Sequence, residues 1–255
     1  MYKSLKEILT SAFWFLAGII ILAGIWQIMS LSFSPLILPS PRETLGAMFD
    51  LFSSPDARQN FYVSAGRALA ALMAVTIMGL GMGVVAGLYP WLEALMKPVK
   101  DILLAIPPVA LTILVIFLFG SGSLQTVGIA GALALPLVYG STVSAVRTVD
   151  RELLEMTEIF NVPRKVRLWD VYLPAVVFSS LPSVLLAAGL TVRLTVMAEV
   201  IVGVTVGIGH ALSMSRVYLA TQEIFAWMLI LLAVVLMIEG GLLYIVKKYL
   251  LRWQA

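Results

Sequence analysis

Long apolar stretches dominate this 255-residue chain and constrain its fold more than any other feature. A helix needs about 20 apolar residues to cross the hydrocarbon core of a bilayer. Hydrophobic residues make up 61% of the sequence and charged residues only 12%, which excludes a soluble globular protein. We therefore expect an all-α, polytopic membrane protein with six spanning helices. The expected helices lie at roughly 12–33, 62–88, 99–119, 123–146, 175–204 and 224–246.

The positive charges are distributed unevenly among the connections, and cytoplasmic connections carry the excess of Lys and Arg. If the N-terminus is cytoplasmic, the outer side holds few of these charges, namely Arg42, Arg58 and Arg216, with Arg67 near a helix start. This asymmetry predicts that both termini lie in the cytoplasm. It also places a short segment at 1–11 and a loop at about 147–174 in the cytoplasm. The whole chain, 1–255, is expected to form one membrane domain.

Several kinds of chemistry are absent from the sequence. Cysteine does not occur and histidine occurs once, so disulfides, thiolate metal sites and histidine clusters are excluded. A Gly-x-x-x-x-Gly-Lys-Ser/Thr loop, which would bind nucleotide phosphates, is also missing. Ser121 and Ser123 with His210 could suggest an intramembrane hydrolase, but a Gly-Ser turn explains them better. We expect no catalytic residue, metal or cofactor in this chain.

A charged island interrupts the apolar pattern between Arg147 and Pro174. A mixed-charge loop of this kind is most often a solvated connector between helices. A solvated connector would not require any particular spacing of residues, but this island has one. The spaced residues are Glu155-Met156-Thr157, then Asn161, then Val171-Tyr172-Leu173-Pro174.

This spacing resembles the EAA motif of bacterial ABC-importer permeases, in which Glu-Ala-Ala is followed by Gly and then by an aliphatic residue, Leu and Pro. Glu155 stands at the position of the Glu and Asn161 at that of the Gly, while Met156 and Thr157 replace the two Ala. The Gly of the motif allows a sharp turn, and Asn is the other residue that best tolerates a left-handed conformation. The bulkier Met156 and Thr157 put the packing near the motif in question, but not its docking role.

The resemblance implies that residues 161–169 form a short cytoplasmic helix that docks into a partner ATPase. Trp169 would be an apolar anchor in a groove of that partner, and Pro163 suits the first turn of the helix. The residues that the resemblance assigns to ATPase coupling are Glu155, Glu158, Asn161, Val162, Arg164, Lys165, Trp169, Leu173 and Pro174.

Other segments are similar to permeases of the nitrate, sulfonate and taurine importers. These segments are Leu38-Pro39-Ser40-Pro41, Ser64-Ala65-Gly66-Arg67-Ala68-Leu69, Ile106-Pro107-Pro108-Val109-Ala110, Ala198-Glu199-Val200-Ile201 and Gly207-Ile208-Gly209. The resemblance implies the type I ABC-importer fold in a bacterial inner membrane, with the pathway between two copies of the chain. Two ATPase subunits, which would hold ATP and Mg, and an external solute-binding protein would complete the importer.

The same resemblance implies alternating access for a small anionic or polar solute such as nitrate, a sulfonate or taurine. The alternative substrate is a vitamin precursor, such as a thiamine-related pyrimidine or a riboflavin-like compound. The alternative classes of protein are a passive channel and a membrane scaffold, neither of which would depend on an ATPase.

Four residues are candidates for the translocation pathway: Pro107, Pro108, Arg193 and Glu199. Adjacent prolines free backbone carbonyls that must face protein or water, although a kink or helix start near the membrane surface is the equal alternative. Arg193 and Glu199 each cost at least about 2.5–3.5 kcal/mol at membrane depth unless paired or hydrated. They lie about 120° apart on an ideal helix, so they should not pair with each other. Both are expected to border the pathway, with Arg193 as the counter-charge for an anion, or else to form buried pairs with another helix.

Three local features predict structure rather than chemistry. Gly79, Gly83 and Gly87 recur every four residues and would let another helix approach closely. The glycine-rich run 203–209 is expected to break or end the fifth span. Ser40 or Pro41 is expected to start a short interfacial helix in the outer loop.

Overall fold

The chain is α-helical in the computed structural model, which describes residues 5–245 and contains no strand in that part. Five helices are long and apolar enough to cross a membrane, and the bent pair α4 and α5 can form a sixth span. The predicted all-α, polytopic architecture is confirmed.

In chain order the helices are α1 (Leu5–Ser32), α2 (Pro41–Ser53), α3 (Pro55–Leu88), α4 (Pro90–Ala105), α5 (Pro108–Phe119), α6 (Ser123–Arg147), α7 (Arg151–Ile159), α8 (Arg164–Val166), the π-helix η1 (Arg167–Tyr172), α9 (Leu173–Val202), α10 (Ile208–Val217) and α11 (Thr221–Ile245).

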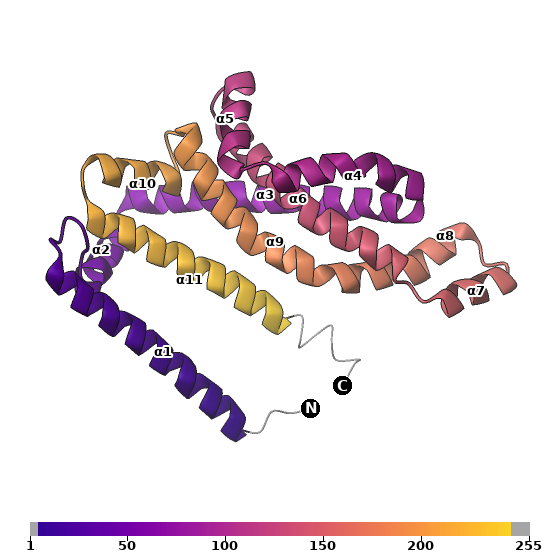
Figure 1. The fold of residues 1–255 in the computed structure, drawn as a ribbon, viewed down its shortest axis with the longest axis horizontal. Coiled ribbons are helices and arrows are strands. Elements are labelled where there is room, and N and C mark those ends of the chain that lie inside the picture. The colour runs from indigo at the N-terminus through magenta and orange to yellow at the C-terminus, as the bar shows by residue number, and fades with distance from the viewer. Residues whose placement is uncertain (1–4, 246–255) are drawn as a thin grey trace.

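The third predicted span, 99–119, is not one continuous helix. It is divided between α4 and α5, which are bent by 105° relative to each other. Ile106 and Pro107 between them are extended, with ψ values of 129° and 131°. A residue before proline avoids the helical conformation, and Pro108 has no N–H to continue the ladder, so it starts a new helix. In Figure 1, α5 consequently points away from the bundle.

Helices α3, α6 and α9 form the core of the molecule and lie side by side (Figure 1). Small side chains line their contacts: Ala71 of α3, Ala130 and Ala134 of α6 and Ala187 of α9 have no exposed surface. Small residues let helix backbones approach closely in a bilayer, where lipid supplies no hydrophobic driving force between helices. The core is therefore held by close packing of three helices.

The glycines at 79, 83 and 87 face α6, in agreement with the packing predicted from their spacing. A Cβ atom added to Gly83 would lie 2.5 Å from the Cβ of Thr142. The corresponding atom on Gly79 would lie 2.8 Å from a methyl group of Val138. The glycine face of α3 thus serves packing within the chain.

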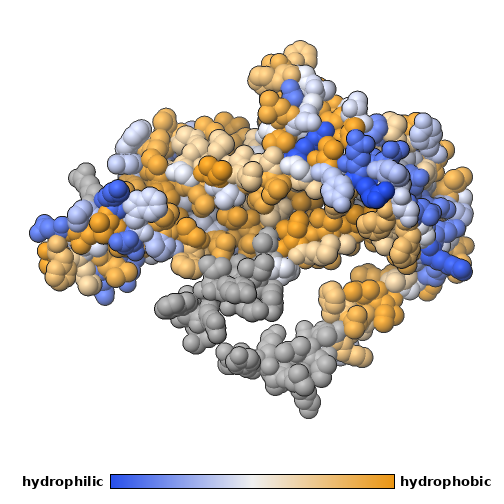
Figure 2. Space-filling view, turned by 180° about the vertical axis from the view of Figure 1, so that it is seen from behind, coloured by the Kyte–Doolittle hydropathy of each residue, from blue (hydrophilic) through white to orange (hydrophobic). Residues whose placement is uncertain are grey.

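Helices α2 and α10 lie at one end of the molecule, and α7 and α8 lie at the opposite end (Figure 1). Helix α2 begins as predicted, because Ser40 caps it, Pro41 is its first residue and Glu43 completes a capping box. Figure 2 shows hydrophilic residues gathered at both ends of the long axis, with a hydrophobic band between them. This distribution suits a bundle whose middle lies in lipid and whose ends meet water.

Candidate functional site: the coupling segment and a buried charge cluster

Residues 147–174, called the coupling segment below, fold into α7, a tight turn and the start of a long helix. Asp150 caps α7 through a side-chain bond to the N–H two residues further on, at 2.9 Å. The helix ends at Ile159, and Asn161 follows with a φ of 50°. The Asn161 N–H donates to the carbonyl of Glu158 at 3.0 Å. The turn therefore has the left-handed Asn that was predicted from the motif.

The helix predicted at 161–169 has the wrong bounds. The first three residues of that range form the turn, and helical structure begins at Arg164 and continues through α8 and η1 into α9. No glycine stands between Arg164 and Pro174 to end it. Pro174 lacks the N–H that an α-helix would use, and the chain makes a π turn just before it, in which the N–H of Leu173 donates to Leu168. The short separate helix of the coupling segment is therefore α7.

Large apolar side chains of the coupling segment face outward at this hydrophilic end of the molecule. The exposed fractions are 75% for Ile159, 73% for Phe160 and 62% for Trp169. Apolar patches exposed among polar residues mark protein interaction sites. Arg167 and Glu158 form an ion pair at 3.2 Å that joins the two arms across the turn. An exposed pair of this kind contributes at most about 1 kcal/mol, so it orients the arms more than it stabilises them.

Most of the predicted coupling residues lie on this surface. Val162 is half-buried, and the side chain of Arg164 lies outside the part that the structure describes. A cavity of about 220 Å³, lined by Trp169 and by Val84 of α3, lies between this segment and the bundle. The exposed members of the predicted set are Glu155, Glu158, Asn161, Lys165, Trp169, Leu173 and Pro174.

A second group of polar residues is buried where α9 ends and α10 begins. Glu199 has no exposed surface and pairs with Arg67 of α3 at 2.6 Å. The hydroxyl of Ser64 lies 2.6 Å from the second carboxylate oxygen, to which the N–H of Gly209 also donates at 2.9 Å. A buried charge without such partners would cost several kcal/mol. Of the two alternatives for Glu199, the structure places it in a buried pair with another helix, with no surface from which to line a pathway in this conformation.

Arg67 joins this group to two further parts of the chain. Its Nη1 donates to the carbonyl of Val206 at 2.7 Å, in the turn before α10. Its Nε and Nη2 donate to the hydroxyl of Ser123 at 3.1 and 2.8 Å, at the first residue of α6. Only 10% of the Arg67 side chain is exposed. One guanidinium therefore connects α3, α6, α9 and the turn to α10.

The turn between α9 and α10 requires glycine at two positions. Gly203 ends α9 with a left-handed φ of 70°, as expected of the run 203–209, and Gly207 has a φ of 142°. A Cβ atom on Gly207 would lie 2.7 Å from a carboxylate oxygen of Glu199 and 2.8 Å from Arg67. The absence of a side chain at Gly207 thus lets the ion pair close beneath the turn.

Arg193 does not pair with Glu199, as their angular separation predicts. Its Nη2 instead donates to Oε1 of Glu239 on α11 at 2.9 Å, and 59% of its side chain remains exposed. Pro107 and Pro108 are exposed at the bend between α4 and α5. The structure therefore places the four pathway candidates in three separate surroundings.

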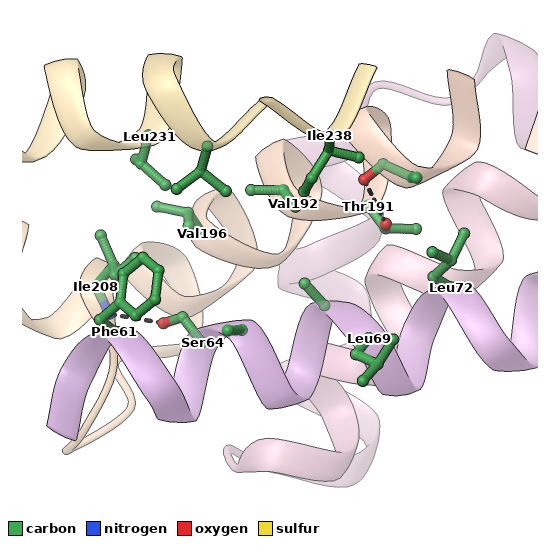
Figure 3. Close-up of a pocket in the computed structure, with 14 residues that line it drawn as sticks. Phe61, Ser64, Leu69, Leu72, Thr191, Val192, Val196, Ile208, Leu231 and Ile238 are labelled. Atoms are coloured by element: carbon green, nitrogen blue, oxygen red, sulfur yellow. Dashed lines mark hydrogen bonds between the residues drawn. The ribbon is translucent and has the colours of Figure 1, made fainter. Parts of the chain in front are cut away.

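A cavity of about 310 Å³ lies between α3, α9, α10 and α11 (Figure 3). Its walls are mainly apolar, with side chains such as Leu69 and Val192, and none of its lining residues is charged. Its two hydroxyl groups are engaged: Ser64 accepts the N–H of Ile208 at 2.7 Å, and Thr191 donates within its own helix. The cavity provides no counter-charge for an anion and contains none of the pathway candidates.

Comparison with known proteins identifies the class of this bundle. Residues 76–253 match the family described as binding-protein-dependent transport system inner membrane component. The chain belongs to this family. It is a multi-pass permease subunit of an ABC importer.

Relatives of the permease match most of its length. It is 30% identical over 251 residues to an Escherichia coli protein named for aliphatic sulfonate transport, covering 97% of this chain and 94% of the relative. It is 30% identical over 241 residues to the riboflavin transport system permease protein of Chloroflexus aurantiacus, covering 93% and 88%. It is 25% identical over 228 residues to the taurine transport system permease protein of E. coli, covering 85% and 81%. The predicted resemblance to sulfonate and taurine permeases is confirmed.

The relatives are permease subunits, which accords with a transport role for this chain rather than an enzymatic one. Among the side chains that the structure describes, no three of His, Asp or Glu lie close enough together to hold a metal ion.

Sequence reasoning missed the partners of both charged residues in α9. Ser64 and Arg67 are predicted only to belong to a segment similar to known permeases, with Arg67 also counted among the basic residues near a helix start, and Glu239 is not among the predicted site residues. The sequence did indicate that these residues need partners, since every charged residue within an apolar run needs a partner or water. Arg67 and Glu239 are such charges, but their pairing depends on which helices are neighbours.

Proposed function

We propose that this permease is one of two membrane subunits of an ATP-driven importer that moves a small anionic or polar organic solute by alternating access. An external binding protein delivers the solute, and two partner ATPase subunits hold ATP and Mg and dock on the coupling segment. In this arrangement both termini and residues 147–174 are cytoplasmic, while α2 and α10 lie on the external side of the membrane.

The surface of the coupling segment is the observation that carries the proposal. Ile159, Phe160 and Trp169 are largely exposed at a hydrophilic end of the molecule, where lipid would not cover them. The same segment also carries exposed basic and acidic side chains, including Lys165 and Glu155. Apolar anchors within a charged rim suit the docking of a protein partner.

The connection of this surface to the bundle supports a role in transmission. Trp169 lies on η1, which continues directly into α9 of the core. A movement of the ATPase that displaces Trp169 would therefore displace α9. In energetic terms the coupling segment would shift the balance between an inward-open and an outward-open state, without performing chemistry itself.

The charge of Arg193 supports an anionic solute. Its side chain is 59% exposed within a span, and an ionised group at membrane depth must face water or protein. The relatives named for taurine and aliphatic sulfonate transport point to the same class of solute. The relative named for riboflavin transport is 30% identical, as is the E. coli relative named for aliphatic sulfonate transport, and it supports the alternative of a vitamin-like compound.

The test is co-expression with candidate ATPase subunits, followed by purification in detergent. Wild type should retain the ATPase, whereas a Glu155→Lys, Trp169→Ala variant should lose it. The matched control is Asp50→Lys, Phe49→Ala on α2, which also reverses one charge and removes one exposed aromatic ring, at the opposite end. If no ATPase associates with wild type, or if both variants lose it equally, the assignment of the coupling segment is wrong. Solute flux that continues without ATP would then indicate a channel, and no flux would indicate a scaffold.

A further inference from the structure

One continuous helical path joins the coupling segment to the buried Glu199. Helices α8, η1 and α9 follow one another without a gap from Arg164 to Val202. At about 1.5 Å per residue this path is roughly 58 Å long, enough to cross a bilayer. Trp169 lies near its inner end, and Glu199 lies three residues before its outer end. The path is not straight, because it contains the π-helical turn of η1 and Pro182 inside α9. It is nevertheless continuous, so a displacement of its inner end can reach Glu199 along one helix.

Glu199 and α3 together hold the first turn of α10. The N–H groups of a helix start have no partner within the helix, and α10 has no side-chain cap of its own. The Gly207 N–H instead donates to Oδ1 of Asn60 at 2.8 Å, and the Ile208 N–H to Ser64 at 2.7 Å. The Gly209 N–H donates to Glu199 at 2.9 Å. A carboxylate at this position also interacts favourably with the positive end of the helix dipole.

Arg67 makes this arrangement rigid. It bonds Glu199 and the carbonyl of Val206 on one side, and Ser123 of α6 on the other. Both charges are removed from water, so separating them would leave an uncompensated charge in the bundle. Gly207 also lies directly against the pair, so the turn is packed closely on Arg67 and Glu199. These contacts favour movement of α10 together with α9 and α3.

The far end of α10 presents a surface to the outer side. Tyr218 and Leu219, which follow α10, are 77% and 68% exposed. Leu219 has a left-handed φ of 56°, which is unfavourable for a residue with a branched side chain. A partner that contacts this surface would act on a helix whose start is fixed to α9 by Glu199.

We propose that the Arg67–Glu199 cluster, formed by these two residues with Asn60, Ser64 and Ser123, couples the outer helix α10 to the coupling segment through α9. The cluster residues are positioning residues, which touch neither solute nor nucleotide. The external binding protein that contacts α10 and the ATPase that contacts α7 would thereby bias the same movement, and each would influence the other. The inference rests on the proposed function.

The test uses spin labels in the permease–ATPase complex, reconstituted in nanodiscs. The chain has no cysteine, so single cysteines can be introduced directly. Two singly labelled variants of the permease are prepared. In one, a labelled cysteine replaces Tyr218 at the outer end, and in the other it replaces the exposed Glu152 on α7. A non-hydrolysable ATP analogue should change the spectrum at both positions. In a Glu199→Gln background, the change at position 218 should fall to half or less, while the change at position 152 is retained.

Controls separate coupling from loss of fold. Glu93→Gln also breaks an ion pair between two helices, the pair with Arg147 of α6, but lies outside the cluster, and it should leave the change at position 218 intact. If Glu199→Gln does not fold, Ser64→Ala replaces it, since it removes a bond to Glu199 and the acceptor for Ile208. An undiminished change at position 218 in a folded cluster variant overturns the inference alone. Absence of any nucleotide response at position 152 in wild type overturns the proposed function, and the inference with it.

Discussion

Arg193 of α9 donates a hydrogen bond from Nη2 to Oε1 of Glu239 on α11, at 2.9 Å. The arginine side chain is 59% exposed. The carboxylate is less exposed, at 31%. An ionised group at membrane depth costs at least about 2.5–3.5 kcal/mol unless it is paired or hydrated. The exposed part of Arg193 therefore belongs against water or another protein surface rather than against lipid tails.

Replacing the two partners of this pair should have different effects on anion transport. Arg193→Gln should lower uptake of taurine or an alkanesulfonate into proteoliposomes at least tenfold, because a hydrogen bond to a charged group contributes about 1.5–3 kcal/mol. Glu239→Gln should leave uptake equal or higher, since it frees the guanidinium. Equal losses in both variants, with the ATPase still bound, would show that the pair serves only to hold α9 to α11.

Packing of α3 on α6 should depend on glycine position rather than glycine content. Gly83→Ala should lower the free energy of unfolding by about 1–3 kcal/mol, because its methyl group would overlap the rigid Cβ of Thr142. Gly81→Ala is the matched control, since no atom lies within 4 Å of the added Cβ. Thermal unfolding in detergent measures both. A similar loss of stability in the two variants would contradict the packing described for this face.

Features that depend on a few neighbouring residues were predictable from the sequence. Asn161 adopts the left-handed conformation expected of it because the preference belongs to the residue itself. The break at Pro107 and Pro108 also follows from local chemistry, since proline removes a donor and restricts its predecessor. The 105° bend that results was not predictable, because it depends on how α4 and α5 pack on the rest of the bundle.

Features that depend on tertiary neighbours were missed. The cost of Glu199 was evident in the sequence, but its partner Arg67 lies 132 positions away and could be chosen only by the packing of α3 on α9. The bounds of the helix around Trp169 were wrong because the chain makes a π turn and continues into α9, where the motif suggested a separate helix. Sequence thus indicated which residues needed an explanation more reliably than it indicated their contacts.

The start of α2 should be sensitive to acid. The backbone N–H and the hydroxyl of Ser40 both donate to the carboxylate of Glu43, at 2.8 and 2.9 Å, and these bonds lower the pKa of Glu43 below its ordinary value of 4.5. Because the folded pKa is the lower one, the carboxylate contributes its full stabilisation above pH 4.5 and loses it as the pH falls through the lowered pKa. Hydrogen exchange of the α2 amides, corrected for intrinsic rates, should therefore accelerate in that range.

Glu43→Gln is the control for this pH dependence. Glutamine can occupy the same position of a capping box but does not titrate. The variant should show slower exchange at acid pH than wild type and little dependence on pH. An equal acceleration in both proteins would assign the acid sensitivity to another group.

The turn at Asn161 should affect ATPase binding through its backbone conformation. Asn161→Gly should bind the ATPase as wild type does, because glycine adopts a φ of 50° without strain. Asn161→Val should bind roughly 5- to 30-fold more weakly, because a left-handed conformation costs a residue with a Cβ about 1–2 kcal/mol and the two arms of the coupling segment would separate. Titration of purified ATPase against each variant in detergent measures the affinities. If Asn161→Gly weakens binding as much as Asn161→Val, the Asn161 side chain itself contacts the ATPase and the backbone turn is not the determinant.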